Sequence, residues 1–115
     1  MVILLVEDDQ VARKATCEIL EHLGHRVESA SSAEQALSLI KNLRFDVLLA
    51  DINLPRMSGI DFADIVIQSF PDIRIIFVSG SGYLLADKTK FPFYLLPKPF
   101  RATQLTAALE SVCSI

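Results

Sequence analysis

Acidic side chains and one lysine stand directly after apolar segments of this chain. Glu7 and Asp8 follow the run Val2–Val6, Asp51 ends a second apolar run, and Lys98 follows a third. Carboxylates gathered at one place repel one another unless a positive charge lies between them. Mg²⁺ binds one or two carboxylates and keeps several waters, and a lysine adds a fixed positive charge. These residue types therefore predict a Mg²⁺ site that handles an anionic group.

The chemistry that suits this set of residues is phosphoryl transfer onto a carboxylate. Asp51 is the candidate nucleophile, because a carboxylate can carry a phosphoryl group as an acyl phosphate. A magnesium ion bound by the acids would offset negative charge during the transfer. Lys98 would pair with the phosphoryl group, and Ser79, at the end of another apolar run, would donate a hydrogen bond to it. Gly80 would leave room for the group.

Each of these residues also has a purely structural explanation. The acids after the first run, with Asp9 among them, would cap and charge the first turn of a following helix. Asp51 would form an Asx turn, Ser79 would be an ordinary loop serine and Lys98 would be solvated. The functional explanation is favoured because suitable residues stand at the ends of four apolar runs at once.

Alternating strand and helix patterns would position these residues. The predicted strands are Val2–Val6, Arg26–Ser29, Asp46–Ala50, Arg74–Val78 and Phe93–Leu96. The predicted helices are Gln10–Leu23, Ala33–Leu43, Gly59–Ser69, a short one at Tyr83–Lys90, and Thr103–Val112. Strands that alternate with helices form a parallel sheet with right-handed crossovers. Ligands bind at the carboxyl ends of such strands, so the candidate residues should share one edge of the sheet.

The first predicted helix has a clear start and an apolar side. Asp9 is the expected N-cap, and Val11, Ala15, Ile19 and Leu23 recur at helical spacing. The second helix is expected to start after the N-cap Ser32. Its apolar stripe is Ala33, Ala36, Leu37, Ile40 and Leu43.

Composition and length limit the classes of protein to which the chain can belong. The 115 residues suffice for one domain, 1–115, and 51% of them are hydrophobic, as expected for a sheet covered on both faces. The apolar runs are far shorter than the roughly 20 residues that cross a bilayer, and no basic segment precedes the first run, so neither a membrane span nor a signal peptide is expected. The net charge of −3 without a basic cluster argues against nucleic-acid binding. Cys17 and Cys113 are interpreted as small buried thiols of a reducing, cytoplasmic compartment.

At this point the chain resembles the receiver domain of two-component response regulators. The matching segments are Val2–Asp9, Asp51–Gly59, Ser79-Gly80 and Pro97–Phe100, in the same order along the whole chain. The resemblance implies a (βα)₅ fold: a doubly wound, five-stranded parallel sheet of the flavodoxin-like type with strand order 2-1-3-4-5. Because one such domain would fill the chain, no output domain is expected; a stand-alone receiver and one excised from a longer protein both stay open.

The resemblance also implies a phosphorylation-controlled signalling role. Asp51 would accept a phosphoryl group from a phosphohistidine on a sensor histidine kinase or a histidine phosphotransfer protein. Glu7 and Asp8 would be the acidic pair that holds Mg²⁺, with Asp51 and the backbone carbonyl of Asn53 as further ligands. Such a domain is a regulatory phospho-acceptor rather than an enzyme, although it assists its own phosphorylation and slow dephosphorylation.

The segment around Lys98 carries the implied switch. Ser79 would be the hydroxyl that moves toward the phosphoryl group, and the Lys98–Pro99 bond would be cis. Receivers usually place an aromatic residue three positions before the lysine; here that position is Leu95, and Tyr94 lies one step out of register, which in a strand reverses the face.

The same segment offers a candidate surface for a downstream protein, formed by the fourth helix, the fifth strand and the last helix. Its apolar residues also suit ordinary core packing. They are Tyr83, Leu84, Leu85, Phe91, Phe93 and Tyr94.

Three other functions fit less well. A flavodoxin-like cofactor binder would need phosphate-binding donors after the first strand, where this chain has acids. A phosphatase-like hydrolase would need an acid near the nucleophile, but two residues beyond Asp51 stands Asn53. A degenerate receiver that only binds is disfavoured because Ser79, Lys98 and the acids are all present.

Overall fold

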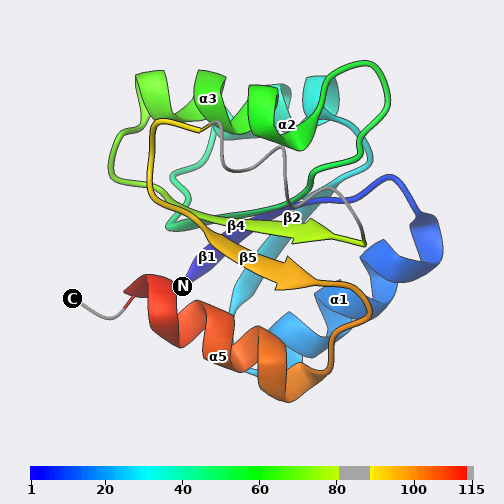
Figure 1. Cartoon of the computed structure of the whole chain (residues 1–115). Coiled ribbons are helices and arrows are strands. Elements are labelled where there is room, and N and C mark those ends of the chain that lie inside the picture. Colours follow the sequence, from blue (N-terminus) through cyan, green and yellow to red (C-terminus); the bar gives the residue numbers. More distant parts are fainter. Residues whose placement is uncertain (81–88, 114–115) are drawn as a thin grey trace.

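The computed structural model describes residues 1–80 and 89–113, which form a five-stranded parallel sheet between two layers of helices (Figure 1). The strands lie in the order β2-β1-β3-β4-β5. This arrangement confirms the predicted doubly wound α/β fold. The strands are β1 (Val2–Val6), β2 (Arg26–Ala30), β3 (Val47–Asp51), β4 (Arg74–Ser79) and β5 (Tyr94–Pro97).

Helices α2 and α3 cover one face of the sheet, and α1 and α5 cover the other (Figure 1). The helices of the described residues are α1 (Gln10–His22), α2 (Ala33–Ile40), α3 (Gly59–Ser69) and α5 (Ala102–Cys113). The predicted short helix Tyr83–Lys90 falls almost entirely outside the described residues. None of the helices in the described ranges is long and apolar enough to cross a membrane.

The starts of three helices are set by side-chain caps. Asp9, Ser32 and Ser58 occupy the N-cap positions of α1, α2 and α3, and each accepts a hydrogen bond from a backbone N–H two or three residues further on. Gly24, with φ of 94°, follows the end of α1 in the left-handed conformation that favours glycine. The predicted element ends agree with the structure to within one residue, except that α2 ends at Ile40.

The prediction of which face of α1 is buried is wrong. Val11 is 78% exposed and Ala15 is also exposed, whereas the buried residues of the helix are Thr16 and Leu20. Two overlapping stripes run along this helix, and periodicity alone does not choose between them. Packing against the sheet selects the face that carries Thr16 and Leu20.

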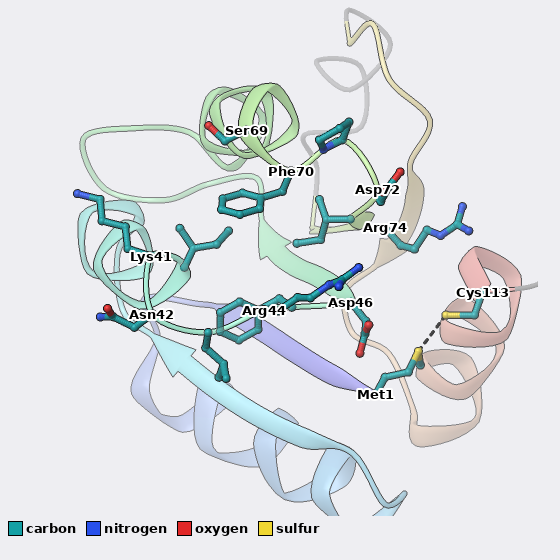
Figure 2. Close-up of a pocket in the computed structure, with 15 residues that line it drawn as sticks. Met1, Lys41, Asn42, Arg44, Asp46, Ser69, Phe70, Asp72, Arg74 and Cys113 are labelled. Atoms are coloured by element: carbon teal, nitrogen blue, oxygen red, sulfur yellow. Dashed lines mark hydrogen bonds between the residues drawn. The ribbon is translucent and has the colours of Figure 1, made fainter.

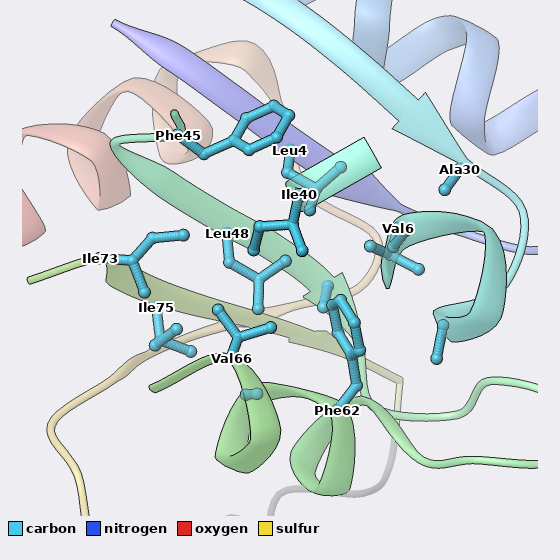
Figure 3. Packing of buried hydrophobic residues seen from close by; sticks show 14 of the residues in the cluster. Leu4, Val6, Ala30, Ile40, Phe45, Leu48, Phe62, Val66, Ile73 and Ile75 are labelled. Carbon is cyan, nitrogen blue, oxygen red and sulfur yellow. The ribbon is translucent and has the colours of Figure 1, made fainter. Parts of the chain in front are cut away.

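Two apolar clusters hold the layers together, one on each face of the sheet. Figure 3 shows part of the larger cluster, in which Phe62 and Val66 of α3 face Leu48 and Ile75 of the sheet. β3 is buried at every position, as expected for a central parallel strand. The sheet is therefore a rigid platform for the residues that follow its strands.

The two cysteines differ from each other. Cys17 is partly buried, but Cys113 is exposed at the end of α5, where its Sγ lies 3.0 Å from Sδ of Met1. The prediction that both are buried is wrong for Cys113. The two differ in position: Cys17 lies inside α1 and packs against the cluster between α1, α5 and the sheet, whereas Cys113 is the last residue of α5.

Candidate functional site

The candidate residues meet at the carboxyl edge of the sheet. Asp51 is the last residue of β3 and Ser79 the last of β4, while Glu7 follows β1 and Lys98 follows β5. β1, β3, β4 and β5 are consecutive neighbours in the sheet, so their ends border one crevice.

Three carboxylates form the centre of this site. Glu7, Asp8 and Asp51 each offer an oxygen atom, and these oxygens all lie within 4.8 Å of one another. Glu7 and Asp51 are nearly buried, at 6% exposure each, whereas Asp8 is exposed. The cluster is thus open to solvent on the side of Asp8.

Lys98 joins two of the three acids. Its Nζ lies 2.6 Å from Oδ2 of Asp51 and 2.7 Å from Oε1 of Glu7. The lysine side chain is 31% exposed, while those of its two partners are 7% and 8% exposed. One ammonium group therefore compensates two carboxylates that have little access to water.

The protonation equilibria of this cluster are shifted. Burial raises the pKa of Glu7, and the negative charge of Asp51 raises it further, while the hydrogen bond from Lys98 opposes both. Burial acts to lower the pKa of Lys98, but its hydrogen bonds and charge interactions with Asp51 and Glu7 outweigh that effect, so the pKa is raised. The lysine therefore stays charged at neutral pH.

The second oxygen of Asp51 is oriented by the following loop. Its Oδ1 accepts a hydrogen bond of 2.9 Å from the backbone N–H of Asn53. Gly59, the first residue of α3, packs directly on this loop: its N–H donates to Ile52 O at 2.9 Å, and a Cβ built on it would overlap the carbonyl group of Asp51. The Asp51 carboxylate is thus held by the loop and by the start of α3.

The donor set fits a hard divalent cation. All three residues of the cluster offer carboxylate oxygens, the ligand type that Mg²⁺ prefers, and the exposed side at Asp8 leaves access for the waters that this ion keeps. The cluster also has excess negative charge, since one lysine faces three acids. Asn53 contacts Asp51 through its backbone N–H. The role of its backbone carbonyl as a metal ligand stays a prediction.

Ser79 is 5% exposed and lies beside the other site residues. Its carbonyl accepts a hydrogen bond of 2.9 Å from the N–H of Lys98, which ties the ends of β4 and β5 together. A Cβ on Gly80 would meet no atom within 4 Å, so neighbouring atoms do not require glycine there. The Lys98–Pro99 peptide bond is cis, as the resemblance implied.

Leu95 and Tyr94 lie on opposite faces of β5. Leu95 packs against the cluster under α2 and α3, and Tyr94 packs against the cluster under α1 and α5. Phe91 and Phe93 also pack on the α2–α3 side, with ring centroids 6.2 Å and 5.4 Å from that of Phe77. These phenylalanines serve core packing; the predicted surface residues Tyr83, Leu84 and Leu85 lie outside the described residues.

A broad hollow of the described surface is remote from the acids. It measures about 810 Å³ and lies at the amino ends of β1, β3 and β4, between the loops at 41–46 and 69–74 (Figure 2). Met1 and Cys113 form one of its sides, and the Lys41 side chain points away from it (Figure 2). The phosphoryl chemistry considered above concerns the opposite edge of the sheet.

Two contacts near the site were missed by the sequence reasoning. Nη1 of Arg13 donates a hydrogen bond of 2.8 Å to the carbonyl of Glu7. Arg56, with φ of 67°, forms a salt bridge of 2.9 Å with Glu34 and so links the loop after β3 to α2. No motif marks either arginine, and only the position of Arg13 one turn beyond the cap Asp9 hints that it can reach back to the acids.

Fold and site together define a class of protein, a doubly wound α/β domain with a carboxylate–lysine cluster at the carboxyl edge of its sheet. The chain matches the family model described as "Response regulator receiver domain" over residues 3–110, and it belongs to that family. It is therefore a receiver domain of the kind found in two-component systems, and this family acts as regulatory phospho-acceptors.

Individual relatives agree with this assignment. The response regulator receiver protein CpdR of Brucella abortus (strain 2308) is 31% identical over 113 residues, which cover 96% of this chain and 94% of CpdR. The sensor kinase CckA of the same organism is 34% identical over 118 residues, but this chain spans only 12% of the length of CckA. A structure of the Vibrio cholerae chemotaxis protein CheY4 superposes with a TM-score of 0.89 at 27% identity, covering 96% of this chain and 97% of CheY4.

Proposed function

We propose that this receiver domain accepts a phosphoryl group on Asp51 from a phosphohistidine of a partner protein. The observation that carries the proposal is the contact of Lys98 with both Asp51 and Glu7, at the centre of three carboxylates within 4.8 Å of one another. A carboxylate oxygen of Asp51 attacks phosphorus, and the P–N bond of the phosphohistidine breaks. The electron pair of that bond stays on the departing nitrogen, and because the other ring nitrogen carries a proton, the histidine leaves as neutral imidazole. The product is an acyl phosphate on Asp51.

The metal part of the proposal concerns Glu7, Asp8, Asp51 and the carbonyl of Asn53. These groups would hold Mg²⁺, which when bound supplies positive charge beside the transferring group. Lys98 binds the incoming phosphoryl oxygens from the other side, because its ammonium already lies within hydrogen-bonding distance of Asp51. The Ser79 hydroxyl, at the neighbouring strand end, donates a hydrogen bond to the same group.

The proposal extends to partners and reaction class. A sensor histidine kinase or a histidine phosphotransfer protein would be the donor, and a downstream protein would recognise the face of the fourth helix, β5 and α5. The domain assists its own phosphorylation and slow dephosphorylation but has no placed general base: two residues beyond Asp51 stands Asn53. Residues 1–115 would form one such domain, acting in the cytoplasm.

Intact-mass measurement tests the proposal. The purified protein is incubated with acetyl phosphate, with Mg²⁺ or with EDTA, beside Asp51→Asn and the control Asp72→Asn, whose carboxylate is exposed at the opposite edge. We expect one phosphoryl adduct that requires Mg²⁺, persists in Asp72→Asn and is absent from Asp51→Asn. Absence of any adduct from the wild-type protein would contradict the proposal and leave a receiver that acts only by binding.

A further inference from the structure

Arg13 reaches from α1 back to the loop that carries the acidic pair. It stands one turn after the cap Asp9, is partly buried, and its Nη1 donates a 2.8 Å hydrogen bond to the carbonyl oxygen of Glu7. Within residues 1–80 and 89–113 no carboxylate forms an ion pair with it. The guanidinium is therefore committed to a backbone carbonyl rather than to an acid.

That carbonyl belongs to the peptide group that joins Glu7 to Asp8. The orientation of this peptide sets the direction in which the chain leaves Glu7, and so the position from which the Asp8 side chain starts. The other fixed points of the loop are the hydrogen bonds Glu7 N–H to Ala30 O, at 3.0 Å, and Asp9 N–H to Glu7 Oε2, at a long 3.4 Å. Asp8 itself is exposed and makes no hydrogen bond within the described residues.

Repulsion between like charges opposes the position of the Asp8 carboxylate near the other two acids. Asp8 shares the site with Glu7 and Asp51, and three carboxylates repel one another, while the one lysine contacts only the other two. An exposed carboxylate that nothing holds would turn toward water. Fixing the peptide with a rigid, charged donor opposes that movement, because arginine loses little freedom when it forms such a bond.

We propose that Arg13 is a positioning residue for the metal site: its hydrogen bond to the Glu7 carbonyl keeps Asp8 within reach of Glu7 and Asp51. The inference rests on the proposed function, because it concerns the same carboxylates. It assigns to α1 a part in the site beyond covering the sheet.

Calorimetric titration of Mg²⁺ into the unphosphorylated protein tests this inference. Arg13→Met keeps most of the aliphatic stem but removes every donor, and Arg13→Lys keeps a charged donor for the carbonyl. Lys14→Met is the matched control, because Lys14 is the neighbouring cation on α1, is exposed, and its side chain makes no hydrogen bond or ion pair within the described residues. Loss of a group that orients metal ligands weakens metal binding about 10- to 100-fold, and we expect the lower value, roughly tenfold, for Arg13→Met.

Arg13→Lys should recover part of the Mg²⁺ affinity, and Lys14→Met should bind Mg²⁺ like the wild-type protein. A second measurement needs no metal: in EDTA, the backbone amides of Asp8 and Asp9 should exchange with solvent faster in Arg13→Met than in either the wild type or Lys14→Met. If Arg13→Met does not fold, Arg13→Leu, which also has no donor, takes its place in both measurements.

The outcomes separate this inference from the proposed function. Equal weakening by Arg13→Met and Lys14→Met would mean that the effect does not depend on the contact with Glu7, and would overturn the inference; loss of one positive charge by itself should favour Mg²⁺ binding. Unchanged Mg²⁺ binding and amide exchange in Arg13→Met would overturn it too, with the proposed function intact. No Mg²⁺ binding by the wild-type protein would overturn both.

Discussion

Lys98 and Asp51 are joined by an ion pair, with Nζ 2.6 Å from Oδ2, although 47 positions separate them along the chain. The same Nζ lies 2.7 Å from Glu7, so one cation connects the ends of β1, β3 and β5. Without bound metal, this cation is the main compensation for two nearly buried carboxylates. The pair thus contributes to stability as well as to the proposed chemistry.

We therefore expect Lys98→Met to destabilise the metal-free protein at neutral pH by about 2 kcal/mol, below the ~3–5 kcal/mol of a fully buried pair because Lys98 is partly exposed. Urea unfolding in EDTA measures this free energy. Lys41→Met removes an exposed cation elsewhere and should change it by less than about 0.5 kcal/mol. Equal stability of the two variants would mean that Lys98 does not compensate the acids.

Glu7 makes stability depend on pH. Its pKa is raised above the usual 4.5, chiefly by burial. Between the usual and the raised pKa the folded protein holds a proton that the unfolded chain has released, so the free energy of unfolding falls as the pH rises through this interval. Glu7→Gln, which does not titrate, should lose this part of the slope when urea unfolding is measured in EDTA at pH values from 4.5 upward.

A control with the opposite sign is available in Glu34. The hydrogen bond from Arg56 lowers the pKa of Glu34, so its contribution to stability is lost only as the pH falls below 4.5. Glu34→Gln should therefore leave the slope above that pH unchanged. If the free energy of unfolding of Glu7→Gln still falls with rising pH above 4.5, another group causes this pH dependence.

The grouping of the candidate site residues at the carboxyl edge of the sheet was predictable because these residues end apolar runs or directly follow them. A carboxylate at the end of a buried strand has a known direction and neighbourhood once strand and helix alternate, which is why Asp51 and Glu7 were placed correctly beside Lys98. Caps were predictable for the same local reason: Asp9 and Ser32 act within three residues of their own positions.

What the sequence did not predict depends on contacts between elements. The rotation of α1 buries Thr16 instead of the stripe that includes Val11, because packing on the sheet chooses between two similar faces. The bond from Arg13 to the Glu7 carbonyl has no motif, since backbone carbonyls accept from any donor that reaches them. Neither feature is encoded by residue type and spacing alone.

Gly59→Ala should damage both stability and the site. The new Cβ would lie 2.9 Å from the carbonyl carbon of Asp51 and closer still to its oxygen, so α3 or β3 has to shift. We expect a loss of about 2 kcal/mol in the free energy of unfolding, typical of overpacking, together with less phosphoryl adduct by mass. Gly24→Ala is the control: its φ of 94° makes alanine strained, at about 1 kcal/mol, but the space around it is open and remote from the acids. Normal adduct formation by Gly59→Ala would show that the acceptor does not need this close packing.

Strand geometry separates Tyr94 from the proposed switch. Side chains alternate along β4, so Ser79 is on the face of Phe77, the face on which Leu95 packs, while Tyr94 lies on the other side of the sheet. When beryllium fluoride and Mg²⁺ are added as a phosphoryl mimic, we expect the methyl resonances of Leu95 to shift and the ring resonances of Tyr94 to stay nearly unchanged. Tyr94→Phe should also form the phosphoryl adduct as the wild-type protein does, because its hydroxyl is distant from the acids. Large shifts at Tyr94 with none at Leu95 would instead mean that the signal crosses the sheet toward α1 and α5.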